Sequence, residues 1–233
     1  MHWCVVAVIV ILSVGFVVTI IGTALYVDFD TKPFANAWTP ETKARMYRLV
    51  TDVHEALPSA QDGFVAYGTL LGVERHGDVI PWDDDVDMCV RASAIPAILE
   101  NVEARGLKWI KFLNYYKVFE ADGDSVFKAK YKWPYVDLFP FDTHPSDPSK
   151  IQVQLAEGWT KKTCDLDTSK VFPLTKARFG HLKVNVPADA RGVLDDWFSK
   201  AWSTECVSNS FNHRKERAIV QQRRASCSEV KMT

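Results

Sequence analysis

Four aspartates stand within five consecutive residues, 83–87, inside a stretch that is otherwise apolar, and residues 80–88 read IPWDDDVDM. The apolar flanks argue against a fully solvated loop. Because side chains alternate along a strand, Asp83, Asp85 and Asp87 would share one face, and Val86 would point into the core. Aspartate is a poor strand former and like charges repel each other, so this face requires a positive partner. We therefore expect a strand over residues 80–90 with one acidic face.

A divalent cation is the most common partner for such a cluster. Carboxylate oxygens suit Mg²⁺ or Mn²⁺, which complete their coordination with water and substrate phosphates. Asp137, the one acid in the apolar run YVDLF of residues 135–139, is a natural further ligand. Two other interpretations stay open: a solvated acidic loop and, for Asp137, a hydrogen-bonded core carboxylate. A calcium-binding EF-hand is excluded because its glycine and its terminal glutamate are missing.

A second motif precedes the acidic stretch. Gly68 and Thr69 stand between the apolar run of residues 64–67, which predicts a buried strand, and a segment with helical character. A helix N-terminus next to glycine offers backbone N–H groups and a positive dipole end to a phosphate. Thr69 would add a hydroxyl donor, and Arg75 would reach a phosphate oxygen. A plain turn is the alternative interpretation of the Gly-Thr pair.

The first 27 residues contain no charged side chain. Since roughly 20 apolar residues in a helix span the hydrocarbon core of a bilayer, residues 3–27 predict a transmembrane anchor, followed by a stem at 28–39. A cleaved signal peptide is the alternative, although the apolar stretch is longer than such peptides require. Because the folded mass follows the anchor, we expect a type II protein with a lumenal catalytic domain in the Golgi or endoplasmic reticulum.

Hydrophobic periodicity and breakers outline the rest of the chain. A helix is expected from Pro40 to Pro58 with Thr39 as its N-cap, and a domain is expected over residues 40–205. The further expected elements are helices at 93–105 and 188–202, strands at 109–112, 116–120, 126–131, 133–139 and 179–186, and a loop at 142–149. Residues 206–233 are expected to form a basic C-terminal tail, which is solvated from residue 211 onward.

Composition excludes several classes of function. A formal net charge of -1 gives no support to a nucleic-acid binder, and 47% hydrophobic with 24% charged residues is typical of a globular chain. The five cysteines include no C-x-x-C pair, so a zinc ribbon or a thioredoxin-type site is not indicated. No G-x-S-x-G motif is present, and the histidines, including His213, are interpreted as structural or surface residues.

The glycine turn, the alternating acids and the third acid form the pattern of the nucleotidyltransferase (polymerase-β-like) superfamily. At family level, residues 67–88 (YGTLLGVERHGDVIPWDDDVDM) closely resemble the signature of the LicD family, which includes bacterial phosphocholine transferases and fukutin-related protein. Residues 135–142 (YVDLFPFD) and 172–202 resemble its second and third blocks. Two features depart from the family: Phe198 is followed by serine rather than glycine, and the cysteines lack the spacing of the zinc site in fukutin-related protein.

The resemblance implies an α+β fold, a nucleotidyltransferase-like mixed sheet flanked by helices, behind the N-terminal anchor. It makes Asp85 and Asp87 the metal-binding pair, Asp137 the third acid and Asp83 a supporting ligand, whereas Asp84 faces away. Gly68 and Thr69 become the phosphate-side turn. The implied activity is metal-dependent transfer of a phospho-alcohol, of the phosphocholine or ribitol-phosphate type, from a CDP-linked donor to a glycan hydroxyl. The alternatives are a catalytically idle membrane-bound scaffold for glycosyltransferases and a nucleotidyltransferase that uses NTP donors.

Overall fold

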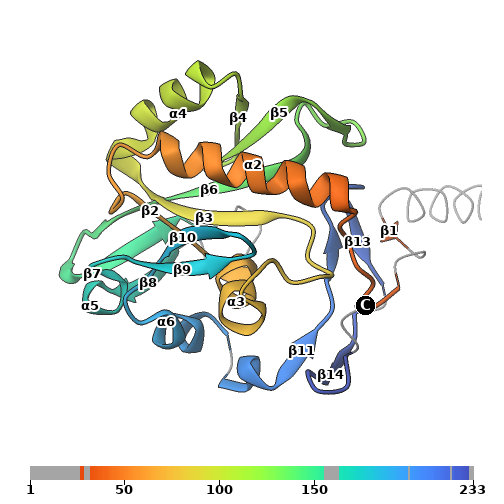
Figure 1. The fold of residues 1–233 in the computed structure, drawn as a ribbon. Coiled ribbons are helices and arrows are strands. Elements are labelled where there is room, and N and C mark those ends of the chain that lie inside the picture. The colour runs from red at the N-terminus through yellow and green to blue at the C-terminus, as the bar shows by residue number, and fades with distance from the viewer. Residues whose placement is uncertain (1–26, 29–31, 155–162, 199, 221, 231–233) are drawn as a thin grey trace, which may run out of the picture.

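The computed structural model describes residues 27–28, 32–154, 163–198, 200–220 and 222–230 (Figure 1). The segment expected to cross a membrane, residues 3–27, lies outside this part of the chain except for Val27, which belongs to the short strand β1 (Val27–Asp28). In the described ranges, no helix has both the length and the apolar character that a membrane crossing requires.

A mixed sheet forms the centre of the described structure, as expected. Its main path runs in the order β2 (Gly63–Val65), β3 (Val86–Arg91), β6 (Lys132–His144), β5 (Tyr115–Ser125) and β4 (Lys108–Phe112), and β7 (Asp147–Gln154) and β8 (Thr163–Asp167) extend it from β6. The strands β3 and β6 are parallel, while the other neighbours along the path are antiparallel. The parallel pair matters because it sets the register of the acids.

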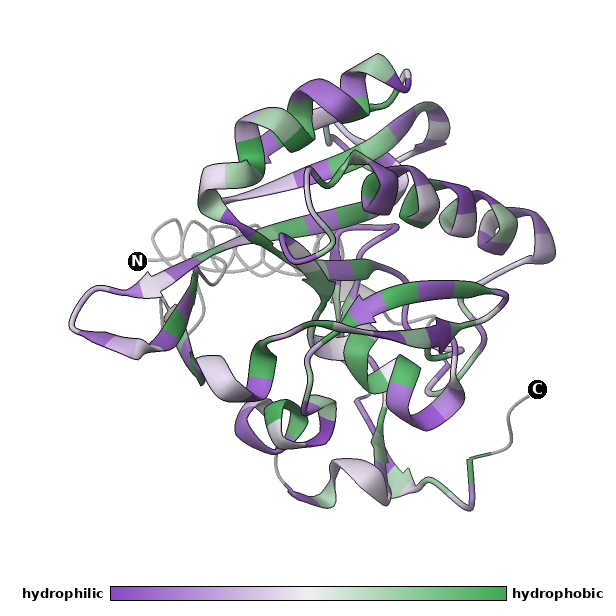
Figure 2. Ribbon diagram, turned by 60° about the vertical axis from the view of Figure 1, so that its left-hand side comes forward, coloured by the Kyte–Doolittle hydropathy of each residue, from purple (hydrophilic) through white to green (hydrophobic). Residues whose placement is uncertain are grey.

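Helix α2 (Pro40–Ala56) begins as predicted. Thr39 and Thr42 form a reciprocal capping box, and Pro40 occupies the first helical position, where no N–H is needed. The buried face of α2 packs on β6, and Figure 2 shows how hydrophobic and hydrophilic residues alternate along the surface helices. Helix α4 (Ile95–Ala104) follows the short 3-10 helix at Ala92–Ala94 and is succeeded by Gly106, whose φ of +81° suits glycine.

A β-hairpin replaces the single strand predicted at residues 179–186. Strand β9 (Thr175–Phe179) pairs with β10 (Leu182–Val186) across a turn in which Gly180 has a φ of +61°. His54 ties α2 to this hairpin, since its Nδ1 lies 3.0 Å from the Val50 carbonyl and its Nε2 accepts from the Asn185 N–H at 3.3 Å. The neutral ring thus joins two elements that are distant in the sequence.

Three local predictions were wrong. The expected strand at 80–90 begins only at Val86. Pro81 has no N–H to donate to a neighbouring strand, and the N–H of Asp83 donates to the Ile80 carbonyl at 3.0 Å, which makes a turn there instead. Residues 126–131 form a turn rather than a strand, with Lys128 at a φ of +56°. The expected loop at 142–149 is largely strand, since β6 continues to His144 and β7 begins three residues later.

The C-terminal helix is shorter than predicted. Helix α6 (Ala190–Trp197) is capped by Asp189, which accepts from the Gly192 N–H, and the short 3-10 helix Lys200–Ser203 follows. Helix α3 (Tyr67–His76) packs against both α6 and β3. The four-residue helix α5 (Thr168–Val171) lies between β8 and β9 in the chain and contacts α6.

The described residues of the expected solvated tail are folded, so this prediction was wrong for them. We call residues 205–220 and 222–227 the C-terminal segment. Strand β11 (Glu205–Val207) pairs with β14 (Arg224–Ser226), and β12 (Phe211–Asn212) pairs with β13 (Arg217–Ile219), which also pairs with β1. A disulfide between Cys206 and Cys227 closes the segment, which runs along one side of the domain in Figure 1. Pairing and cross-linking, rather than a large apolar face, hold these residues, which is why their composition suggested a tail.

Candidate active site

Three charged side chains form a row across the centre of the sheet. Asp87 on β3 pairs in register with Asp137 on β6, and Asp137 pairs with Lys117 on β5. Residues that pair directly across neighbouring strands point to the same face. Asp137 and Lys117 are only 4% and 2% exposed, so the charges lie in an environment that penalises any unpaired ion.

Asp85 completes the acidic group from the position just before β3. One carboxylate oxygen each from Asp85, Asp87 and Asp137 lies within 4.8 Å of the other two. Burial raises the pKa of Asp87 well above its usual range, and repulsion from Asp85 and Asp137 adds to this shift. Burial, opposed by Lys117, raises the pKa of Asp137 to about 6. Three ionised carboxylates at this separation repel one another. Their oxygens suit a divalent cation, which would stabilise the ionised forms.

Asp83, the fourth predicted ligand, lies outside this group of three. It precedes the strand, so the period-two argument does not apply to it, and its carboxylate faces the first turn of α3. A Cβ on Gly68 would lie 2.5 Å from Asp83 Oδ2, so glycine is needed there for close approach. Asp83 lines the same cavity as the three acids, and its role as a supporting ligand stays a prediction.

The Gly-Thr pair divides into two different roles. Helix α3 begins at Tyr67, so Gly68 lies in its first turn and faces the cavity, as a phosphate-side position requires. Thr69 is 1% exposed, and its hydroxyl oxygen accepts from the backbone N–H of Asp87 at 2.8 Å. The side chain of Thr69 thus holds the backbone of Asp87, and donation from its O–H to a substrate phosphate stays a prediction.

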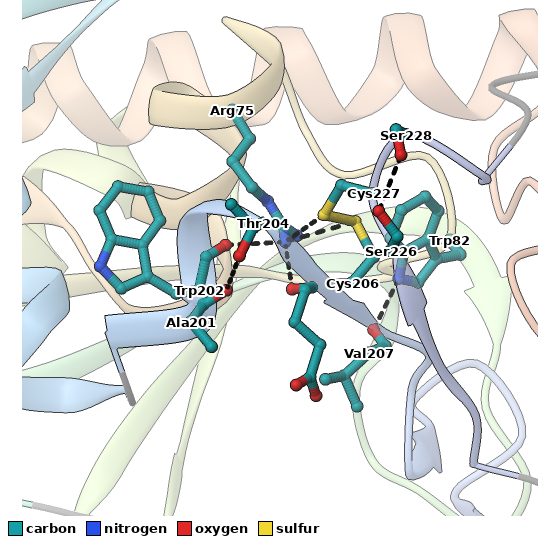
Figure 3. Close-up of a disulfide and its surroundings, with 11 residues drawn as sticks. Arg75, Trp82, Ala201, Trp202, Thr204, Cys206, Val207, Ser226, Cys227 and Ser228 are labelled. Atoms are coloured by element: carbon teal, nitrogen blue, oxygen red, sulfur yellow. Dashed lines mark hydrogen bonds between the residues drawn. A yellow bond between two sulfur atoms is a disulfide. The ribbon is translucent and has the colours of Figure 1, made fainter.

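Arg75 connects the site to the C-terminal segment. Its Nη1 donates to the carbonyls of Trp202 and Glu205, both at 3.3 Å, and Figure 3 shows the guanidinium beside the Cys206–Cys227 disulfide. Arg75 also lines the cavity, but these bonds identify it first as an anchor of that segment. Its contact with a substrate phosphate stays a prediction.

Lys117 is a site residue that the sequence analysis missed. Its Nζ donates to both oxygens of Asp137, at 3.0 and 2.9 Å, and it lies 3.7 Å from the centre of the Tyr135 ring. The rings of Phe112, Tyr115 and Tyr131 also lie within 6 Å of this ammonium. The available signal was its alternation with Tyr115 and Phe119, which places a lysine on the buried face of a strand.

His213 and Asp84 form a second arrangement that the sequence analysis missed. The Nδ1 of His213 lies 2.8 Å from Asp84 Oδ1, and its Nε2 lies 3.2 Å from Asp85 Oδ2. Burial opposes the charged imidazole, but attraction from Asp85 and the hydrogen bond with Asp84 raise the pKa of His213 to about 10. His213 therefore lies between two carboxylates in the cavity lining rather than on the outer surface, and Asp84 lies outside the group of Asp85, Asp87 and Asp137.

A cavity of about 850 Å³ opens above these groups. The acids, Lys117 and Gly68 line one part of it, and residues of the C-terminal segment line another. This volume lies within the range that holds ligands of nucleotide or drug size, roughly 300–1,000 Å³. The arrangement combines an acidic floor, whose carboxylates could hold a cation, with a helix N-terminus that can face a phosphate.

Comparisons with known proteins find relatives of this chain. Ribitol 5-phosphate transferase FKRP of Mus musculus is 28% identical over 176 residues, which are 70% of this chain and 33% of that protein. An uncharacterized protein of Rickettsia prowazekii (strain Madrid E) is 28% identical over 156 residues, 64% of this chain and 52% of that protein. The chain thus spans between one third and about half of the length of these relatives.

Among solved structures, the lincomycin-bound lincosamide antibiotic adenylyltransferase LnuA matches with a TM-score of 0.38 and 13% identity, over 64% of this chain and 80% of that one. Residues 61–189 match the family model described as LicD/FKTN/FKRP, nucleotidyltransferase domain. The matched residues include Asp85, the row of Asp87, Asp137 and Lys117, and Gly68. They make up more than half of the chain. The chain therefore belongs to the LicD/FKTN/FKRP family of nucleotidyltransferase domains.

Proposed function

We propose that this protein is a divalent-metal-dependent transferase that moves a phospho-alcohol from a CDP-linked donor to a glycan hydroxyl. The observation that carries the proposal is the group of three carboxylates, Asp85, Asp87 and Asp137, at one end of a cavity within the family-matched region. The phospho-alcohol is of the ribitol-phosphate or phosphocholine type, and the name of the FKRP relative supports the first.

In the proposed reaction, the acceptor hydroxyl attacks the phosphorus that bears the alcohol, and the bond to the CMP leaving group breaks. Mg²⁺ or Mn²⁺, held by Asp85, Asp87 and Asp137, would supply neutralisation of the diphosphate charge. Gly68 presents backbone at the N-terminus of α3 to a phosphate. Lys117 keeps Asp137 ionised and in place. Because no group of the protein forms a covalent bond to the substrate in this reaction, most of the rate comes from positioning and electrostatic stabilisation.

One of the two acids, Asp85 or Asp137, would accept the proton of the attacking hydroxyl. Burial raises the pKa of both carboxyls, and a carboxylate with a raised pKa is a better proton acceptor near neutral pH. We further propose that residues 3–27 anchor the protein as a type II membrane protein of the Golgi or endoplasmic reticulum.

The test is turnover of defined donors by the full chain. CDP-ribitol, CDP-choline, CTP and ATP are screened first by thermal shift with Mn²⁺, because a bound donor raises the unfolding temperature. Release of CMP from the stabilising donor is then measured for the wild type and for Asp87→Asn. Asp142→Asn, which removes an exposed carboxylate on the same strand as Asp137, is the matched control.

We expect CMP release from a CDP-alcohol, a loss of roughly 100-fold or more in Asp87→Asn, and no change in Asp142→Asn. Pyrophosphate release from an NTP would instead identify a nucleotidyltransferase. Donor binding without turnover, equal in the wild type and in Asp87→Asn, would identify an idle scaffold. Full activity of Asp87→Asn at saturating donor would refute the role assigned to the carboxylates.

A further inference from the structure

His213 reaches the acidic site from outside the family-matched region. The match ends at residue 189, whereas His213 follows strand β12 in the C-terminal segment. Its imidazole bridges two consecutive carboxylates, with Nδ1 at 2.8 Å from Asp84 and Nε2 at 3.2 Å from Asp85. One nitrogen thus contacts an acid of the metal-binding group, and the other contacts an acid that lies apart from Asp87 and Asp137.

Asp84 uses its carboxylate to hold the C-terminal segment. It is 6% exposed, and its Oδ2 accepts from the backbone N–H groups of His213 and Arg214, at 3.0 and 3.3 Å. Its Oδ1 is the atom that contacts the His213 ring. Because both the backbone and the ring of His213 bind one buried carboxylate, the direction of the ring is determined at its Nδ1 end.

Other contacts hold the segment independently of these carboxylates. The Trp82 indole donates to the Val207 carbonyl at 3.0 Å, and the Asn209 amide donates to the Trp82 carbonyl at 2.8 Å. The Cys206–Cys227 disulfide closes the base of the segment. His213 is therefore held on a framework that is attached to the acidic loop at several points, and its Nε2 is presented to Asp85.

We propose that His213 is a positioning residue for the metal-binding site. Its Nε2 donates to one oxygen of Asp85, which restricts rotation of that carboxylate and leaves the other oxygen for the cation. The proposal rests on the proposed function only in that the three carboxylates bind a metal. Groups that orient a metal ligand through a hydrogen bond typically contribute 10–100-fold in metal affinity, so the effect is measurable.

The experiment measures Mn²⁺ affinity of the full chain by electron paramagnetic resonance of free Mn²⁺. His213→Leu keeps a side chain of similar size and removes the donor, whereas His213→Gln places an amide N–H near the position of Nε2. His181→Leu, an exposed histidine on the β9–β10 turn, is the matched control. Thermal unfolding in EDTA shows whether the two His213 variants share the same metal-free stability.

We expect Mn²⁺ binding to weaken roughly 10–100-fold in His213→Leu, to recover largely in His213→Gln, and to be unchanged in His181→Leu. Equal binding by the wild type and His213→Leu would overturn this proposal alone, as would an equal loss in His213→Gln and His213→Leu at matched stability. Absence of Mn²⁺ binding in the wild type would refute the metal site, and the role of His213 with it.

Discussion

The pair of Lys117 and Asp137 leads to a quantitative prediction about stability. Both side chains are almost fully buried, and the ammonium contacts both carboxylate oxygens at 2.9–3.0 Å. Removal of one partner from a buried pair leaves an uncompensated charge and typically costs about 3–5 kcal/mol. Lys117→Met keeps the length of the side chain and removes its charge, so we expect a loss of this size in metal-free protein at neutral pH.

The double variant makes the prediction specific to the interaction. In Lys117→Met with Asp137→Asn, neither charge remains, so we expect most of the loss to disappear. The coupling free energy should then be at least as large as the loss that is avoided, about 3 kcal/mol or more. Lys108→Met, which removes an exposed lysine on β4, should change the free energy of unfolding by less than about 0.5 kcal/mol.

Urea denaturation in EDTA, followed by circular dichroism, measures these differences. With a slope of about 2–3 kcal/mol per M, the Lys117→Met midpoint should fall by roughly 1–2.5 M without a change in slope. Losses of the two single variants that add in the double variant, within about 0.5 kcal/mol, would refute the reasoning, because they would show that the two charges do not stabilise each other.

Three further predictions concern residues of the domain. Burial lowers the pKa of His54 to about 4, so between pH 4 and 6.5 the unfolded chain binds a proton that the folded chain does not. The free energy of unfolding should therefore keep its full value above pH 6.5 and fall by up to about 2–3 kcal/mol as the pH falls to 4. Urea titrations at each pH should show a smaller fall in His54→Gln, and an equal fall would contradict the role of His54. Replacement of Cys206 and Cys227 by alanine, which opens a loop of 21 residues, should lower the free energy of unfolding by about 3 kcal/mol. It should also weaken Mn²⁺ binding, and an unchanged Mn²⁺ affinity would show that the disulfide does not support the site. Thr69→Val leaves the backbone N–H of Asp87 without its acceptor and should lower the free energy of unfolding, measured with urea, by about 1–3 kcal/mol. Thr69→Ser keeps the acceptor and should be close to the wild type, so equal stability of the two variants would contradict the assigned hydrogen bond.

Much of the fold and the acidic centre could be predicted because the signals are local. Thr39 and Pro40 start a helix through their own backbone chemistry, and the structure confirms its first turn. The acids of residues 83–87 and Asp137 lie on or beside two strands that pair in parallel, so proximity in the motif became proximity in space. The predicted strand at 80–85 failed because a proline and a turn hydrogen bond outweighed the alternating pattern.

The sequence by itself determined the start of helix α2, the family to which the pattern belongs and the cluster of carboxylates. Only the tertiary structure decided which charges balance them. Lys117 contacts Asp137 through the antiparallel register of β5 and β6, and His213 contacts an acid 129 residues earlier in the chain because the C-terminal segment returns to the acidic loop. No local pattern names the partner in either contact, since strand register and the folding back of the C-terminal segment bring the two residues together only when the chain folds.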